Sequence, residues 1–184
     1  MKFAALVLLV LILLLGGMGF TQYNAIINKQ EMVSASYADI DAQLQRRSDL
    51  IPNLLNSVKG YMSHEQGIID AITQSREKLS GATNVGELAQ ASGEMESALK
   101  NLMVVVEQYP DLKANTNFIQ LQDELSGTEN RIATARRDYN DAVRSFNAQI
   151  KRFPGSLLAS YFGFNPATYF EASEVSQEVP NVSF

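Results

Sequence analysis

The residue types that most often carry enzyme chemistry are scarce in this chain. It has 184 residues, no cysteine and one histidine, His64. Disulfides, iron–sulfur clusters and zinc ribbons are therefore excluded, and one chain cannot build a multi-histidine metal site. The Glu-x-x-His motif of carboxylate-bridged metal bundles is missing too, because Tyr61 stands three residues before His64. We expect His64 to be a surface or capping residue near a bend between helices.

Sequence motifs for nucleophilic or phosphate chemistry are also absent. The sequence contains neither a Gly-x-Ser-x-Gly nucleophile turn nor a Gly-x-x-x-x-Gly-Lys phosphate loop. The formal net charge of −5 argues against nucleic-acid binding through bulk charge. We therefore expect a protein that is not an enzyme, with no catalytic residue, no bound metal, no cofactor and no nucleic-acid partner.

Polar residues cluster instead on a predicted helix that contains residues 129–147. Glu129 and Arg136 are seven residues apart and share a helix face, and Tyr139 and Asn140 follow them closely. Two interpretations stay open for this cluster. It forms a polar layer inside a helical bundle that sets the register or binds a partner, or it is a solvated face with ordinary ion pairs within one helix.

Two further segments are dense in polar and turn-forming residues. Asp49 and Asn53 lie on either side of Pro52, and Tyr109–Lys113 includes a second proline. The simpler interpretation of the second segment is punctuation between two helices. The candidates for a polar or partner-binding surface are Asp49, Asn53, Tyr109, Asp111, Lys113, Glu129, Arg136, Tyr139 and Asn140.

Helices must position these side chains, since apolar residues recur three and four positions apart after residue 20, partly in a heptad rhythm. The predicted apolar faces run over 26–44, 54–79, 88–106 and 118–150. Arg46 and Arg47 suit the negative end of the first helix dipole, and Ser48 or Asp49 suits the cap of the second helix. At Ser48–Pro52 the chain either reverses or continues as one kinked helix, and reversal is favoured.

This pattern predicts an all-α fold, with an antiparallel up-and-down four-helix bundle over residues 23–170. Residues 156–164 predict a short helix that forms a hydrophobic lid over one end of the bundle. Residues 171–184 carry three glutamates and no lysine or arginine, which predicts a flexible acidic tail.

The N-terminal segment is strongly apolar. Phe3–Phe20 contains no charged residue, and about 20 helical residues span a hydrocarbon core of about 30 Å. Residues 1–22 therefore predict a transmembrane anchor that continues into the first bundle helix. The alternative is a cleaved signal peptide with its cleavage site near Gly17–Gly19. Basic residues are in excess on the cytoplasmic side of a span. Lys2 before the segment and Lys29 after it therefore favour a cytoplasmic N-terminus only weakly.

Several sequence blocks in a fixed order resemble the LemA family of bacterial membrane-anchored proteins. The blocks are Tyr23-Asn24, Arg46–Leu54, Val58–Tyr61, His64-Glu65, Tyr109–Asn115, Phe118, Leu121-Gln122, Thr128–Ala133, Ala135-Arg136, Tyr139-Asn140, Phe153-Pro154 and Phe162–Phe164. Two departures are small: Tyr37 stands where the family commonly has Trp, and Ser48 where it often has His. The resemblance implies a four-helix bundle behind one N-terminal span, and it implies no enzyme.

A related member of that family is linked to building a membrane organelle, which suggests membrane shaping or scaffolding. We expect a non-enzymatic, single-pass scaffold or interaction protein of the cell (inner) membrane, acting in membrane organisation or remodelling. Its expected partners are the lipid bilayer, other membrane proteins and a second copy of the chain. The alternative is a membrane-tethered sensor whose bundle binds a ligand. Family descriptions place the bundle in the cytoplasm, whereas the lysine count leans the other way, so the side of the membrane stays open.

Overall fold

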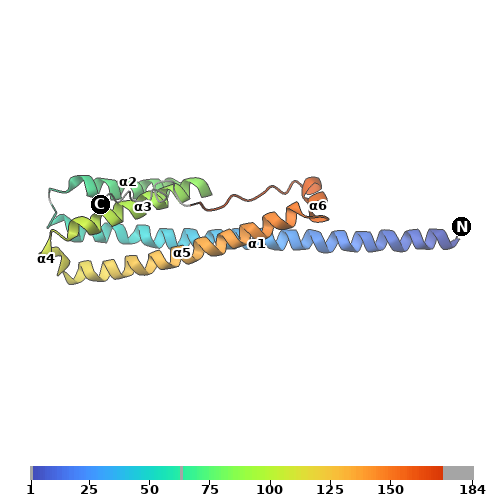
Figure 1. The fold of residues 1–184 in the computed structure, drawn as a ribbon, viewed down its shortest axis with the longest axis horizontal. Coiled ribbons are helices and arrows are strands. Elements are labelled where there is room, and N and C mark those ends of the chain that lie inside the picture. The colour runs from blue at the N-terminus through green and yellow to red at the C-terminus, as the bar shows by residue number, and fades with distance from the viewer. Residues whose placement is uncertain (1, 63, 172–184) are drawn as a thin grey trace, which may run out of the picture. The chain divides into compact units, whose positions relative to one another are not determined.

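Every regular element of the described residues, 2–62 and 64–171, is an α-helix in this computed structural model. The helices, drawn in Figure 1, are α1 (Lys2–Lys59), α2 (Gln66–Gly81), α3 (Val85–Val106), α4 (Pro110–Lys113), α5 (Thr116–Lys151) and α6 (Gly155–Phe162). The predicted all-α bundle with a long N-terminal apolar helix is confirmed. Apart from Glu171, the predicted acidic tail lies outside the described residues.

Helix α1 does not reverse at Ser48–Pro52, so that prediction is wrong. The helix runs from Lys2 to Lys59 with Pro52 inside it. Proline removes one helical hydrogen bond and costs about 3 kcal/mol in a helix interior, but Ile51 and Leu54 on either side are fully buried. Burial of these flanking side chains offsets the cost, and the chain turns only after Lys59.

Asp49 is therefore not a helix cap, contrary to the sequence prediction. It is exposed within α1, where its carboxylate accepts a hydrogen bond of 2.8 Å from the side-chain amide of Gln45. Arg46 and Arg47 likewise lie inside the helix rather than at its C-terminus.

Side chains cap the starts of α3 and α5. Asn84 caps α3, since its side chain accepts the backbone N–H of Glu87 at 3.0 Å, and the Glu87 carboxylate accepts the backbone N–H of Thr83 at 2.8 Å. At α5 the side chain of Asn115 accepts the backbone N–H groups of Asn117 and Phe118. The bonds to the Asn84 and Asn115 side chains satisfy amide groups that a helix start leaves unpaired.

The chain divides into two compact units, and the second contains residues 39–137 together with 169–171. It holds the C-terminal part of α1, all of α2, α3 and α4, and the N-terminal part of α5. Its core residues include Ile51, Leu54, Val58, Met62, Ile72, Met95, Leu102, Leu112 and Phe118. This apolar core fixes the helices that carry the candidate site.

The first unit contains residues 1–38 and 138–168. Here the end of α5 lies antiparallel to α1: the Gln149 side chain donates to that of Gln22 at 2.7 Å, Lys29 donates to the hydroxyl of Ser145, and Tyr37 packs near Tyr139. Ile26, Phe146, Ile150 and Ala159 form the core of this unit, so α6 covers the α1–α5 pair close to residue 26.

Within this unit the apolar N-terminal part of α1 is uncovered. All large apolar side chains from Phe3 to Phe20 are exposed. Among the described residues, α1 is the one helix long and apolar enough to cross a membrane. Packing on α1 thus begins at about Gln22, where the apolar segment ends.

Gly155, at the start of α6, approaches the preceding backbone closely. A Cβ atom at this position would lie 2.2 Å from the carbonyl oxygen of Gln149, whereas a Cβ at Gly127 in α5 would meet no atom within 4 Å. We predict that Gly155→Ala lowers the free energy of unfolding by about 2 kcal/mol, because backbone must shift.

Gly127→Ala is the matched control, and alanine's better helix propensity should raise the free energy of unfolding by up to about 1 kcal/mol. Both variants are measured by urea unfolding of the full chain in mild detergent, followed by circular dichroism. Equal effects of the two substitutions would contradict the close approach.

Candidate binding groove

Arg47 of α1 is the buried charge at the base of the candidate site. Its side chain is 1% exposed. It occupies an inward position of the helical pattern, three residues after Leu44 and four before Ile51, both of which are buried. The helix therefore directs the guanidinium into the second unit rather than into water.

Both terminal nitrogens of the buried guanidinium, Nη1 and Nη2, donate hydrogen bonds. Nη1 donates to Oε2 of Glu129 in α5 at 2.6 Å. Nη2 donates to the hydroxyl and the carbonyl oxygen of Ser92 in α3, at 2.8 and 3.2 Å. Burial lowers the pKa of Arg47 and the Glu129 carboxylate opposes this effect; the guanidinium stays protonated at physiological pH. Arg47 therefore joins three helices through one charge.

Further charges extend this network along α3 and α5. Arg136 donates from Nη2 to the Ser92 hydroxyl at 2.5 Å and lies 3.9 Å from the carboxylate of Glu96. Glu96 also accepts a bond of 2.7 Å from Lys100. Burial acts to raise the pKa of Glu96, but the Lys100 bond and the charges of Arg136 and Arg47 hold that pKa below its ordinary value. The two arginines thus share the Ser92 hydroxyl, and each also lies near a glutamate.

The network ends on an aromatic ring. The guanidinium carbon of Arg136 lies 5.2 Å from the ring centre of Phe170, a cation–π distance. Phe170 is itself buried. The last described residues therefore pack directly on the charge network.

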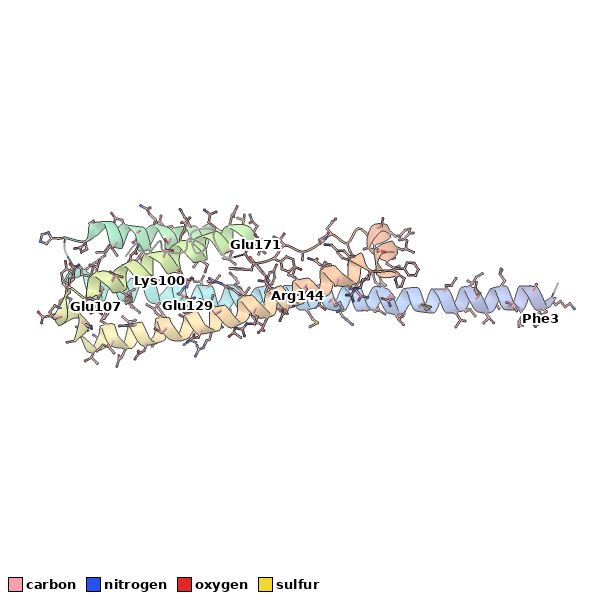
Figure 2. The ribbon with its side chains drawn as sticks, viewed as in Figure 1. Phe3, Lys100, Glu107, Glu129, Arg144 and Glu171 are labelled. Atoms are coloured by element: carbon pink, nitrogen blue, oxygen red, sulfur yellow. The ribbon has the colours of Figure 1, made fainter. Side chains whose placement is uncertain are left out.

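A groove opens above this network between α3 and α5, with a volume of about 660 Å³. Its apolar lining is Leu99, Met103, Val104 and Leu125, and its polar lining is Arg47, Glu96, Lys100, Gln122, Ser126, Glu129 and Asn130. Figure 2 shows Lys100 on α3 and Glu129 on α5. Binding pockets typically hold about 300–1,000 Å³ and combine apolar walls with a few polar groups. The groove therefore has the size and the mixed lining of a binding pocket.

The nine candidate residues occupy different places. Glu129 and Arg136 meet in the network described above. Tyr139 and Asn140 belong to the first unit, where the Tyr139 hydroxyl donates to the carbonyl oxygen of Thr168 at 2.8 Å and Asn140 is half-buried. Asn53 is exposed on α1, as Asp49 is.

The other three candidates surround the short helix α4. The hydroxyl of Tyr109 donates to the Glu65 carboxylate at 3.2 Å. Lys113 pairs with Glu107 at 2.6 Å, with both side chains exposed. Asp111 is exposed in the first turn of α4. None of these three residues lines the groove.

The sequence reasoning missed Arg47, Ser92, Glu96 and Lys100. Arg47 had a usable signal, because it continues the buried series Ile40, Leu44, Ile51, Leu54 and Val58 at spacings of three and four. Glu96 and Lys100 had none, since a pair four residues apart is typical of any exposed helix. Within the described residues no cluster of histidine, aspartate or glutamate is arranged to hold a metal ion, and His64 is exposed between α1 and α2.

The Arg47–Glu129 pair yields a stability prediction. Glu129→Gln removes the carboxylate that balances a buried charge, so we expect the free energy of unfolding to fall by about 2 kcal/mol, less than for a fully buried pair because 39% of the Glu129 side chain is exposed. The measurement is urea unfolding of the full chain in mild detergent.

Glu107→Gln breaks the exposed pair with Lys113 and is the matched control, expected to change the free energy of unfolding by less than about 1 kcal/mol. The double variant Arg47→Met/Glu129→Met should recover most of the loss, because it removes both charges. A Glu129→Gln protein as stable as the control would contradict the importance of the pair.

Comparison with known proteins places this architecture in a family. The LemA family model matches residues 36–184. The chain is 29% identical over 155 residues to Protein LemA of Metamycoplasma hominis, covering 84% of this chain and 71% of that protein. It is 28% identical over 176 residues to magnetosome protein MamQ 2 of Paramagnetospirillum magneticum, covering 82% of this chain.

Magnetosome protein MamQ of Magnetospirillum gryphiswaldense is 26% identical over 175 residues. The match spans 65% of the length of MamQ 2 and 64% of this MamQ, so both are longer than the region they share with this chain. Because the family model covers the larger part of the sequence, the chain belongs to the LemA family.

Proposed function

We propose that this chain is a membrane-anchored helical interaction protein, with no catalytic activity of its own, that organises other proteins at a membrane. The uncovered apolar part of α1 supports the anchor. The MamQ relatives are magnetosome proteins by name, and a role in membrane organisation is the corresponding proposal for this chain.

The observation that carries the interaction role is the groove between α3 and α5. Val104 on its wall is 68% exposed, next to Met103 and Leu99. Within its lining, the charges of Arg47 and Lys100 balance those of Glu96 and Glu129. We propose that the occupant is an amphipathic helix of another membrane protein, whose apolar face covers Val104 and whose polar residues meet the balanced charges.

A photo-crosslinking experiment tests this role. Replacing Val104 with p-benzoylphenylalanine places a photoreactive ring in the groove, and the full chain is irradiated in native membranes. We expect discrete adducts with another membrane protein, identified by mass spectrometry. The same amino acid at Gln74, exposed on α2 outside the groove, is the control and should give none of these adducts.

Two results would contradict the proposal: the absence of adducts from the Val104 position, or the same adducts from both positions. An adduct of twice the chain mass would identify a second copy as the occupant and would replace the proposed partner.

A sensor that binds a small molecule is the second candidate function, and the groove volume of about 660 Å³ favours it. In this case a ligand should raise the melting temperature of the full chain in detergent in a thermal-shift screen, since binding to the folded state stabilises it. Met103→Trp fills the groove from its wall and should abolish that rise. A ligand that stabilises the Met103→Trp protein equally would not bind the groove.

A further inference from the structure

Helix α6 presents a cluster of large apolar and aromatic side chains to solvent. Leu157 and Tyr161 are four residues apart and so share a helix face; Tyr161 is 81% exposed, and Phe153 just before the helix is 80% exposed. The opposite side of α6 is accounted for, because Leu158 and Ala159 pack into the core around Ile26. An exposed apolar cluster on an otherwise packed helix marks a surface that meets something other than water.

The position of α6 along α1 indicates what that surface meets. The ring of Tyr23 lies 4.8 Å from that of Phe162 and 6.0 Å from that of Phe164. Phe20, at the end of the uncovered apolar segment, precedes Tyr23 by only about 4.5 Å along the helix axis. Figure 1 shows α6 beside α1 in this region. The exposed face of α6 is thus within one helical turn of the point where α1 becomes covered.

Charge around α6 suits a lipid headgroup layer. Residues 153–170 contain no charged side chain. Immediately before them stand Lys151 and Arg152, both exposed and without an ion pair among the described residues. Tyrosine rings concentrate at membrane interfaces, where phenylalanine and leucine form the apolar face of interfacial helices, and basic side chains beside them attract anionic phosphates.

We propose that α6, with Phe153, Leu157 and Tyr161, lies in the headgroup layer of the bilayer that α1 crosses, and that Lys151 and Arg152 bind its anionic phosphates. This inference rests on the proposed anchoring by α1. The first unit would then contact lipid at two places, along the apolar part of α1 and at α6. Because α6 packs firmly on Ile26, it fixes the rotation of the α1–α5 pair about the membrane normal, which a single span leaves free.

Tryptophan fluorescence provides the test, because the natural sequence contains no tryptophan. The full chain carrying Tyr161→Trp is reconstituted into vesicles of phosphatidylcholine and phosphatidylglycerol with brominated acyl chains. We expect bromine to quench its emission by roughly half, and removal of phosphatidylglycerol or Lys151→Gln/Arg152→Gln to weaken that quenching.

The Tyr37→Trp protein is the matched control within the same unit. Tyr37 lies 14 residues beyond Tyr23, which is about 21 Å further along the helix, so bromine should leave its emission unchanged. If the Tyr161→Trp and Tyr37→Trp proteins are quenched alike, or if Tyr161→Trp is shielded from acrylamide without bromine quenching, a lipid contact of α6 is wrong. The second pattern would indicate that a second copy covers the helix.

A third reporter separates this inference from the anchor itself. Bromine should quench the Phe20→Trp protein if α1 crosses the bilayer. Quenching of Phe20→Trp without quenching of Tyr161→Trp would overturn the α6 proposal and leave the anchor standing. Quenching of neither would overturn both. If the quenching of Tyr161→Trp is the same without anionic lipid and in the Lys151→Gln/Arg152→Gln protein, the proposed role of these two basic residues is wrong.

Discussion

Helix α1 has an uncovered apolar part and a part covered by protein along one continuous backbone. The packing of the first unit depends on where these two parts meet. From Phe3 to Phe20 its large apolar side chains are exposed, and burial of apolar surface is worth about 25 cal/mol per Å², so water is a poor solvent for this segment. From Gln22 onward the same helix is covered by the end of α5. Packing therefore begins where the apolar run ends, and α6 folds back at that boundary.

The arrangement of the helices in the second unit depends instead on a buried charge, that of Arg47. Arg47 is surrounded by Glu129 on α5 and Ser92 on α3, and a buried guanidinium tolerates few alternative arrangements because an unpaired charge is costly. The pair therefore favours one alignment of these three helices. It also leaves charged groups in the lining of an apolar-walled groove, the surface at which we propose that a partner binds.

Much of the fold follows from local sequence signals, and the exceptions have physical causes. Helices α3 and α5 were readable because apolar residues recur three and four positions apart over 88–106 and 118–150. The reversal expected at Pro52 was wrong because proline and two arginines are local signals for a helix end, whereas burial of Ile51 and Leu54 is a tertiary effect that outweighs them.

The candidate site was less accessible from sequence than the fold. Glu129 and Arg136 stood out on a shared face, but their partners Arg47 and Ser92 are 82 and 44 residues away in the chain, and no local spacing links them. The apolar wall at Leu99 and Met103 resembles any core-facing stripe until the packing of α3 against α5 leaves it partly uncovered. Grooves arise from tertiary arrangement, which composition and periodicity do not encode directly.

We propose that α1 is one helix that crosses a bilayer up to about Phe20 and is packed on protein beyond it. A spin-label scan of single cysteines from residue 4 to residue 36, in the full chain reconstituted into bilayers, tests this most directly. We expect high oxygen accessibility without helical periodicity up to Phe20, and then a period of about 3.6 residues with buried positions at Ile26 and Val33. Accessibility of residues before Phe20 to a water-soluble relaxation reagent, or a mature chain lacking those residues, would contradict it.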